Sequence, residues 1–98
     1  MKNFNIPEEK IGEIVIFIDG EAPRVTDWSA DKHIKMAEKE LLKETKEMII
    51  EDHLLPEVND GIYFTIDNDL ELYSHITEVR MVKGNKKYDI HIFTELSY

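Results

Sequence analysis

One long segment of helical periodicity, Ala30 to His53, constrains the fold of this chain more than any other feature. Its apolar residues recur mostly at spacings of three and four, which places them on one stripe of an α-helix. Pro56 closes the segment, because proline cannot continue a helix. The stripe consists of Ala30, Ile34, Ala37, Leu41, Met48 and Ile49.

The segments on either side of this predicted helix have the composition and the period of strands. Residues 13–20, "EIVIFIDG", predict the first strand, and their nearly continuous apolar run suggests cover on both faces. Residues 62–66 alternate between apolar and other side chains, which predicts a second strand. A three-residue loop at 67–69 would pair Ile66 with Leu70 and Phe64 with Leu72. A two-residue loop would set Ile66 opposite Glu71, so we reject it.

The last hairpin is predicted to turn at Gly84-Asn85. This register matches charged residues with charged ones and apolar residues with apolar ones, which supports it. The stretch from Leu70 to Lys83 is then either one bent strand or two. The pairs that the register implies are Arg80 with Asp89, Glu78 with His91, and Val79 with Ile90.

These segments fit one domain over residues 1–98, near the commonest domain size. We predict an α+β fold of two layers, with one long helix packed on a mostly antiparallel sheet of four to five strands, in the order β-α-β-β-β. A chain of this length buries roughly two thirds of its unfolded surface, so the core is small. The predicted core consists of Ile14, Ile16, Ile18, Ile34, Leu41, Met48, Phe64, Leu72 and Ile90.

One helix covers only one face of such a sheet, and the other face carries aromatic side chains. Contiguous exposed aromatic residues are typical of interfaces, so we predict a homodimer that buries this face. The alternative is a half-exposed face that is tolerated or covered by the termini. Around the aromatic residues lie Val15, Thr65, Arg80, Asp89 and His91. The predicted dimer interface consists of Phe17, Tyr63, Tyr73 and Phe93.

The net charge of −9 is concentrated in one third of the chain. From Glu47 to Val79 there are nine acidic residues and no Lys or Arg, so the remainder holds 21 − 9 = 12 acidic residues against 12 basic ones. An acidic chain is repelled by DNA, RNA and anionic lipid, which argues against direct binding to nucleic acid or to a membrane. The charge favours a basic protein as partner.

Four glutamates of the predicted helix, Glu40, Glu44, Glu47 and Glu51, follow one another at spacings of four, three and four, and therefore share one ridge. Like charges at these spacings disfavour the helix slightly, which suggests that the charge is used. We predict a partner-binding surface made of this ridge and the acidic residues that follow it. The alternative is an acidic surface that serves only solubility. The predicted surface consists of Glu40, Glu44, Glu47, Glu51, Asp52, Glu57, Asp60, Asp67, Asp69 and Glu71.

Signals for enzymatic chemistry are weak. Asp19-Gly20 ends the first predicted strand, where α/β sites often lie, and Asp27 nearby would complete a carboxylate site for Mg²⁺. A turn is the simpler interpretation. The four histidines show no ligand spacing, and the chain has no P-loop, nucleophile elbow or dinucleotide fingerprint. We therefore expect no catalytic residue, no metal and no cofactor.

The chain has no cysteine, and its N-terminal stretch has no apolar core of signal-peptide length. Its longest apolar run, "IVIFI", is too short to span a bilayer. These features predict a cytoplasmic protein.

In its small size, its acidity, its lack of cysteine and its segregated negative face, the chain resembles the DNA-mimic proteins that bacteriophages use against host DNA-binding proteins. Members of that group inhibit uracil-DNA glycosylase, restriction enzymes or the nucleoid protein HU. They share no common motif, so the resemblance assigns no individual residue. It implies a non-enzymatic inhibitor that occupies the basic DNA-binding surface of a host protein. HU fits a dimeric acidic surface, since its own DNA-binding surface is basic and two-fold.

Two other functions remain open at this point. One is an enzyme that uses Asp19 and nearby carboxylates with Mg²⁺. The other is a structural assembly protein that uses the aromatic sheet face and the sheet edges.

Overall fold

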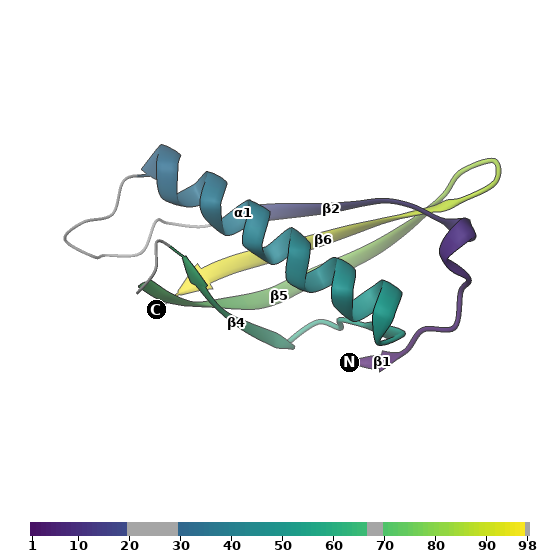
Figure 1. The fold of residues 1–98 in the computed structure, drawn as a ribbon, viewed down its shortest axis with the longest axis horizontal. Coiled ribbons are helices and arrows are strands. Elements are labelled where there is room, and N and C mark those ends of the chain that lie inside the picture. Colours follow the sequence, from purple (N-terminus) through teal and green to yellow (C-terminus); the bar gives the residue numbers. More distant parts are fainter. Residues whose placement is uncertain (20–29, 67–69, 98) are drawn as a thin grey trace.

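A computed structural model describes residues 1–19, 30–66 and 70–97 of the chain. The fold is α+β, with one long helix on a four-stranded, mostly antiparallel sheet, as predicted (Figure 1). The main elements are β2 (Ile11–Asp19), α1 (Ala30–Lys46) with its π-helical continuation η2 (Glu47–Glu51), β4 (Gly61–Ile66), β5 (Leu70–Lys83) and β6 (Tyr88–Ser97). Three short elements were not predicted: β1 (Lys2–Asn3), the 3₁₀ turn η1 (Glu8–Lys10) and β3 (Leu54–Leu55).

The strand order in the sheet is β2-β6-β5-β4. The pairs β4–β5 and β5–β6 are antiparallel, whereas β2 and β6 are parallel. The edge strands β2 and β4 therefore run in the same direction. The helix that lies between them in the chain crosses the sheet diagonally and packs on both edges (Figure 1). This crossing buries one face of the sheet and leaves the opposite face open.

The register between β4 and β5 confirms the prediction, with Ile66 opposite Leu70 and Phe64 opposite Leu72. The loop 67–69 itself lies outside the described residues. The stretch Leu70–Lys83 is one strand of 14 residues. A β-bulge between Ile76 and Glu78 shifts its pairing with β6, so the strand bends without ending.

The predicted register of the last hairpin was wrong by two residues. Arg80 lies opposite His91, and four residues, 84–87, form the loop, in which the Gly84 amide donates to the Lys87 carbonyl at 2.8 Å. A turn at Gly84-Asn85 would have set Lys83 opposite Lys86, whereas the observed loop sets Lys83 opposite a tyrosine. A shift of two residues keeps every side chain on its face. The observed pairs that replace the predicted ones are Arg80 with His91, Glu78 with Phe93, Val79 with Ile92, and Val82 with Asp89.

Asp89, predicted to pair with Arg80, has another partner. Its Oδ1 accepts a hydrogen bond from the Glu13 amide at 2.8 Å, next to the irregular pairing between Ile11 and Ile14. A β-carbon on Gly12 would collide with this carboxylate, so a larger residue there would displace the Asp89 side chain from the Glu13 amide.

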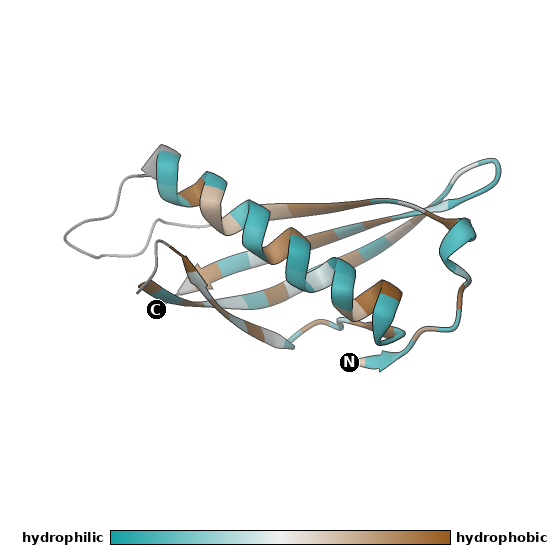
Figure 2. Ribbon diagram, in the orientation of Figure 1, coloured by the Kyte–Doolittle hydropathy of each residue, from teal (hydrophilic) through white to brown (hydrophobic). Residues whose placement is uncertain are grey.

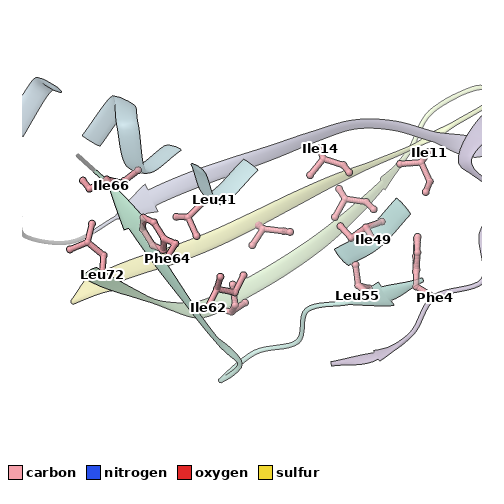
Figure 3. Packing of buried hydrophobic residues seen from close by; sticks show 14 residues of the cluster. Phe4, Ile11, Ile14, Leu41, Ile49, Leu55, Ile62, Phe64, Ile66 and Leu72 are labelled. Atoms are coloured by element: carbon pink, nitrogen blue, oxygen red, sulfur yellow. The ribbon is translucent and has the colours of Figure 1, made fainter. Parts of the chain in front are cut away.

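The core lies between α1 and the covered face of the sheet (Figure 3). Five of the predicted core residues are buried, and Ile16, Ile18 and Met48 are partly buried against them. Ile34 was wrongly placed, because it is only half-buried and lies outside the core cluster. The buried predicted residues are Ile14, Leu41, Phe64, Leu72 and Ile90.

The buried side of the helix recurs every four residues: His33, Ala37, Leu41, Thr45 and Ile49. Two of these five are polar, which is why an apolar pattern placed the stripe slightly off its true position. Thr45 is buried because its hydroxyl donates to the Leu41 carbonyl at 2.6 Å within the helix. Hydrophilic residues predominate along the helix, with apolar residues between them (Figure 2).

The helical segment ends two residues earlier than predicted. In its last turn, η2, the Asp52 amide donates to the Glu47 carbonyl at 3.1 Å, an i to i−5 bond that makes the turn wider than an α-turn. His53 then adopts a positive φ of 54°, and its carbonyl accepts from the Phe4 amide at 2.7 Å. In this way the β1–β3 pair covers the C-terminal end of the helix. Among the described residues no helix is long and apolar enough to cross a membrane.

Candidate functional site

The four glutamates of the predicted ridge lie along one flank of the helix. Successive residues turn by about 100°, so Glu40 lies to one side of the buried Leu41 and Leu42 lies to the other. The Leu42 side faces β2, where Leu42 lines a groove together with two lysines, Lys35 and Lys39. Four glutamates of the helix therefore lie on the flank away from β2, whereas the flank toward β2 carries Lys35 and Lys39 together with Glu38. We call Glu40, Glu44, Glu47 and Glu51 the acidic ridge.

The acidic ridge has no counter-ion among residues 1–19, 30–66 and 70–97. Glu47 and Glu51 are exposed, and Glu40 and Glu44 are half-buried. Within the described part of the chain, none of the four carboxylates forms an ion pair or a side-chain hydrogen bond. Along an α-helix, successive members lie about 4.5 to 6 Å apart, as the rise per residue requires. A cationic partner would relieve their mutual repulsion.

Asp52 follows the acidic ridge at the end of the helix, whereas Glu57 and Asp60 already face a positive charge. Asp52 is exposed at the end of η2. The Met1 amino group lies 2.5 Å from Oδ2 of Asp60 and 3.5 Å from Oε1 of Glu57. The hydrogen bond from this ammonium group, and then the one from the Glu57 amide, lower the pKa of Asp60. The same contact with Asp60 raises the pKa of the Met1 amino group.

The remaining predicted binding residues are not part of the ridge. Asp67 and Asp69 lie outside the described residues. Glu71 is exposed on β5 opposite Thr65, and both side chains alternate with buried ones, so they project from the open face. The ten predicted residues therefore do not form one surface. The structure brings together the acidic ridge and Asp52 and separates them from Glu71.

The open face carries the four predicted interface aromatics in two pairs. Phe17 and Phe93 stack with ring centroids 4.7 Å apart and an interplanar angle of 13°, and Tyr63 lies against Tyr73 with centroids 4.8 Å apart. Phe17 is 40% exposed and Tyr63 is 81% exposed. The guanidinium of Arg80 lies 4.9 Å from the centroid of Phe93. The face thus presents rings that contact one another while one side of each pair remains open to solvent.

Gly61 is a feature of this face that sequence reasoning missed. The Tyr73 ring lies where a β-carbon on Gly61 would be. The two residues are diagonal neighbours, because Gly61 pairs with His75 in the β4–β5 register. The sequence does show a glycine at the start of a strand, two positions before a tyrosine on the same face. Its contact with Tyr73 can be inferred only once the register of β4 and β5 is known.

The proposed Mg²⁺ site at the end of the first strand is not described. Asp19 ends β2, but its side chain, like the whole of Asp27, lies outside the described residues. In the part of the chain that is described, no group of three or more His, Asp or Glu residues is arranged to hold a metal ion. Of the four histidines, His33 is buried on the helix and His91 contacts Phe17 edge to face at 5.6 Å.

No family model, no curated protein and no solved structure matches this chain.

Proposed function

We propose that this protein is a non-enzymatic acidic binding protein whose acidic ridge, with Asp52, occupies the basic DNA-binding surface of another protein. The observation that carries the proposal is a row of four carboxylates on one flank of the helix without a counter-ion among the described residues. A further support is that the chain has no Lys or Arg from Glu47 to Val79. This segment therefore supplies no basic side chain that could neutralise the row.

The proposed partner is a DNA-binding protein of the HU type. A DNA duplex carries one charge per roughly 1.7 Å of its axis, about three times the density of the acidic ridge alone. A homodimer through the open face would place its two ridges on opposite sides, so each ridge meets its partner at the density of one helix. Glu71 is too far around the molecule to join the same contact, so the mimic proposed here rests on the helix and its C-terminal end.

A DNA-displacement assay against HU at two salt concentrations tests this proposal. Reversing three charges in Glu47→Lys, Glu51→Lys and Asp52→Lys should slow association at low salt by about tenfold or more, since charges of this kind steer encounter. The fold should be retained, because lysine is favourable at a helix C-terminus. Displacement by the unmodified protein should weaken as salt rises.

A charge-matched control uses Glu8→Lys, Glu9→Lys and Glu71→Lys, which change the net charge by the same amount away from the ridge. This variant should retain most of the displacement activity. If both triple variants displace DNA as well as the unmodified protein does, the ridge is only a solvated surface. Equal loss in both variants would show that net charge acts without any defined surface.

We also propose that the protein is a homodimer through the open face. The support is the 81% exposure of Tyr63 and the 40% exposure of Phe17 on a face that no described element covers. Sedimentation at micromolar concentration should give a dimer. Tyr63→Glu should weaken the dimer, whereas Asn85→Glu in the exposed hairpin loop adds the same charge and should not. A monomer at these concentrations would refute this part of the proposal.

A further inference from the structure

The part of β5 that extends beyond β4 has a strand edge that is unpaired among the described residues. The six residues of β4 pair with Leu70–His75, whereas β5 continues to Lys83. At Ile76 the preceding chain still bonds to β5, because the Asn59 amide donates to the Ile76 carbonyl and the Ile76 amide donates to the Asp60 carbonyl, both at 2.9 Å. From Thr77 to Lys83 the strand has only β6 as a sheet neighbour among the described residues. We call this stretch the β5 free edge.

A groove lined by both apolar and charged residues runs beside the β5 free edge. It has a volume of about 470 Å³ and takes two of its lining residues, Val79 and Met81, from the edge itself. Val58 lines the other side of the groove and is 52% exposed, and Met81 on the edge is 41% exposed. A free strand edge exposes unpaired N–H and C=O groups and so offers a template for another strand. The groove adds a place for the side chains that such a strand would direct toward the helix layer.

The charges around the groove and the hairpin loop beside it are net positive, in contrast to the chain as a whole: the Met1 amino group, Lys2, Arg80, Lys83, Lys86 and Lys87 stand against Glu57, Asp60, Glu78 and Asp89. The two nearby acids Glu57 and Asp60 face the Met1 amino group, and Glu78 accepts a hydrogen bond from Arg80 at 2.8 Å. Lys2 lines the groove, and Lys83 ends the free edge. Neither lysine has an ion-pair partner in the described part of the chain. Lys86 and Lys87 follow in the hairpin loop.

We propose that the β5 free edge binds an extended segment of a partner protein as an added strand, and that this segment is net acidic with apolar side chains at alternate positions. Its backbone bonds to the free N–H and C=O groups of β5. Its apolar side chains lie in the groove against Val58 and Met81, on the side of Lys83, and its acidic side chains project from the opposite face, beside Arg80. Backbone pairing supplies affinity in this mode of recognition, and the alternating side chains supply specificity. This site is independent of the acidic ridge, because it shares no residue with the ridge and its net charge has the opposite sign.

The test uses an eight-residue peptide of alternating valine and aspartate, blocked at both ends, and ¹⁵N-labelled protein. Addition of peptide should shift the amide signals of Thr77–Lys83 and slow hydrogen exchange at alternate amides of this stretch. Met81→Asp should weaken binding by about tenfold or more, as removal of a central apolar contact does. Lys83→Glu should weaken it as well and leaves the groove intact. Lys43→Gln lowers the net charge by the same amount as Met81→Asp, on the exposed side of the helix, and should have no effect on peptide binding.

Two control peptides separate the parts of the proposal. A peptide with N-methyl groups on the backbone amides that face β5 should not bind, and one with lysine in place of aspartate should bind at least tenfold more weakly. The proposal is overturned if no signal of the free edge shifts at about millimolar peptide. Equal binding of either control peptide also overturns it. Exchange protection of the same amides without peptide, growing with protein concentration, would assign the edge to a second copy of this chain and exclude the partner segment.

Discussion

The covered and open faces of the same sheet differ in what their side chains contact. On the covered face, isoleucine and leucine from all four strands meet the helix, and Ile76, Ile90 and Ile92 have no exposed surface at all. On the open face, rings contact each other across neighbouring strands and keep one side in solvent. One face is therefore stabilised by burial against another layer, and the other by pairs within the layer. The comparison implies that a change on the covered face should cost far more stability than a change on the open face.

The largest expected effect is at Leu41, in the middle of the helix and fully buried. Leu41→Ala should lower the free energy of unfolding by about 2–5 kcal/mol, through lost burial and the cavity that remains. Leu42→Ala, one residue along and half-buried, should cost less than about 2 kcal/mol. Urea denaturation measures both. A loss below about 1 kcal/mol at Leu41 would show that the helix does not form the second layer as described.

The contrast between the faces was partly visible in the sequence. The period-two alternation in residues 62–66 fixed the register of β4 against β5, because a slip by one residue would have moved apolar side chains to the wrong face. The last hairpin could not be fixed in this way. A slip by two residues keeps every side chain on its face, so the loop geometry decides between the two registers.

The helix and the candidate site were predictable to different degrees. The glutamate spacing placed the acidic ridge on one flank without knowledge of the rest of the fold. The apolar pattern could not predict that Thr45 is buried, because threonine is polar and its hydroxyl bonds to a carbonyl of its own helix. Glu71 could be assigned to the wrong surface because sequence proximity to the other acids says nothing about the face from which a strand residue projects. Likewise, the β5 free edge results from the unequal lengths of two strands, which turn signals do not give.

The second prediction concerns the pair of Gly61 and Tyr73 on the open face. Gly61→Ala should destabilise the fold by about 1–2 kcal/mol, because the β-carbon would displace the Tyr73 ring from its place on β4. In a Tyr73→Ala background the same change should stabilise by about 0.5–1 kcal/mol, since alanine is better than glycine in a strand. Thermal or urea unfolding of the four proteins gives the coupling. The same sign in both backgrounds would mean that the ring does not rest on Gly61.

A smaller effect, of opposite sign, is expected at Ser74 on the covered face. Its Oγ is buried and has no hydrogen-bond partner in the described part of the chain, which is unfavourable for a hydroxyl. Ser74→Ala should therefore raise the free energy of unfolding by about 1 kcal/mol. Thr94→Val is the matched control, because the Thr94 hydroxyl, also in the buried layer, donates to the Phe17 carbonyl at 3.4 Å. Its removal should lower the free energy of unfolding. A loss of stability in Ser74→Ala would show that this hydroxyl has a partner.

The smallest effect tests whether the open-face rings stabilise each other. The stacked arrangement of Phe17 and Phe93 predicts a coupling free energy of about 0.5–1 kcal/mol in a double-mutant cycle with Phe17→Leu and Phe93→Leu. Ile16→Val and Ile92→Val, a paired position on the covered face, give the comparison for aliphatic contacts. The cycle should be measured below the concentration at which the protein associates, so that only contacts within one chain contribute. A coupling near zero would contradict the pairwise account of this face. The rings would then contribute little to the fold of one chain, and their exposure would favour a role in binding a second copy.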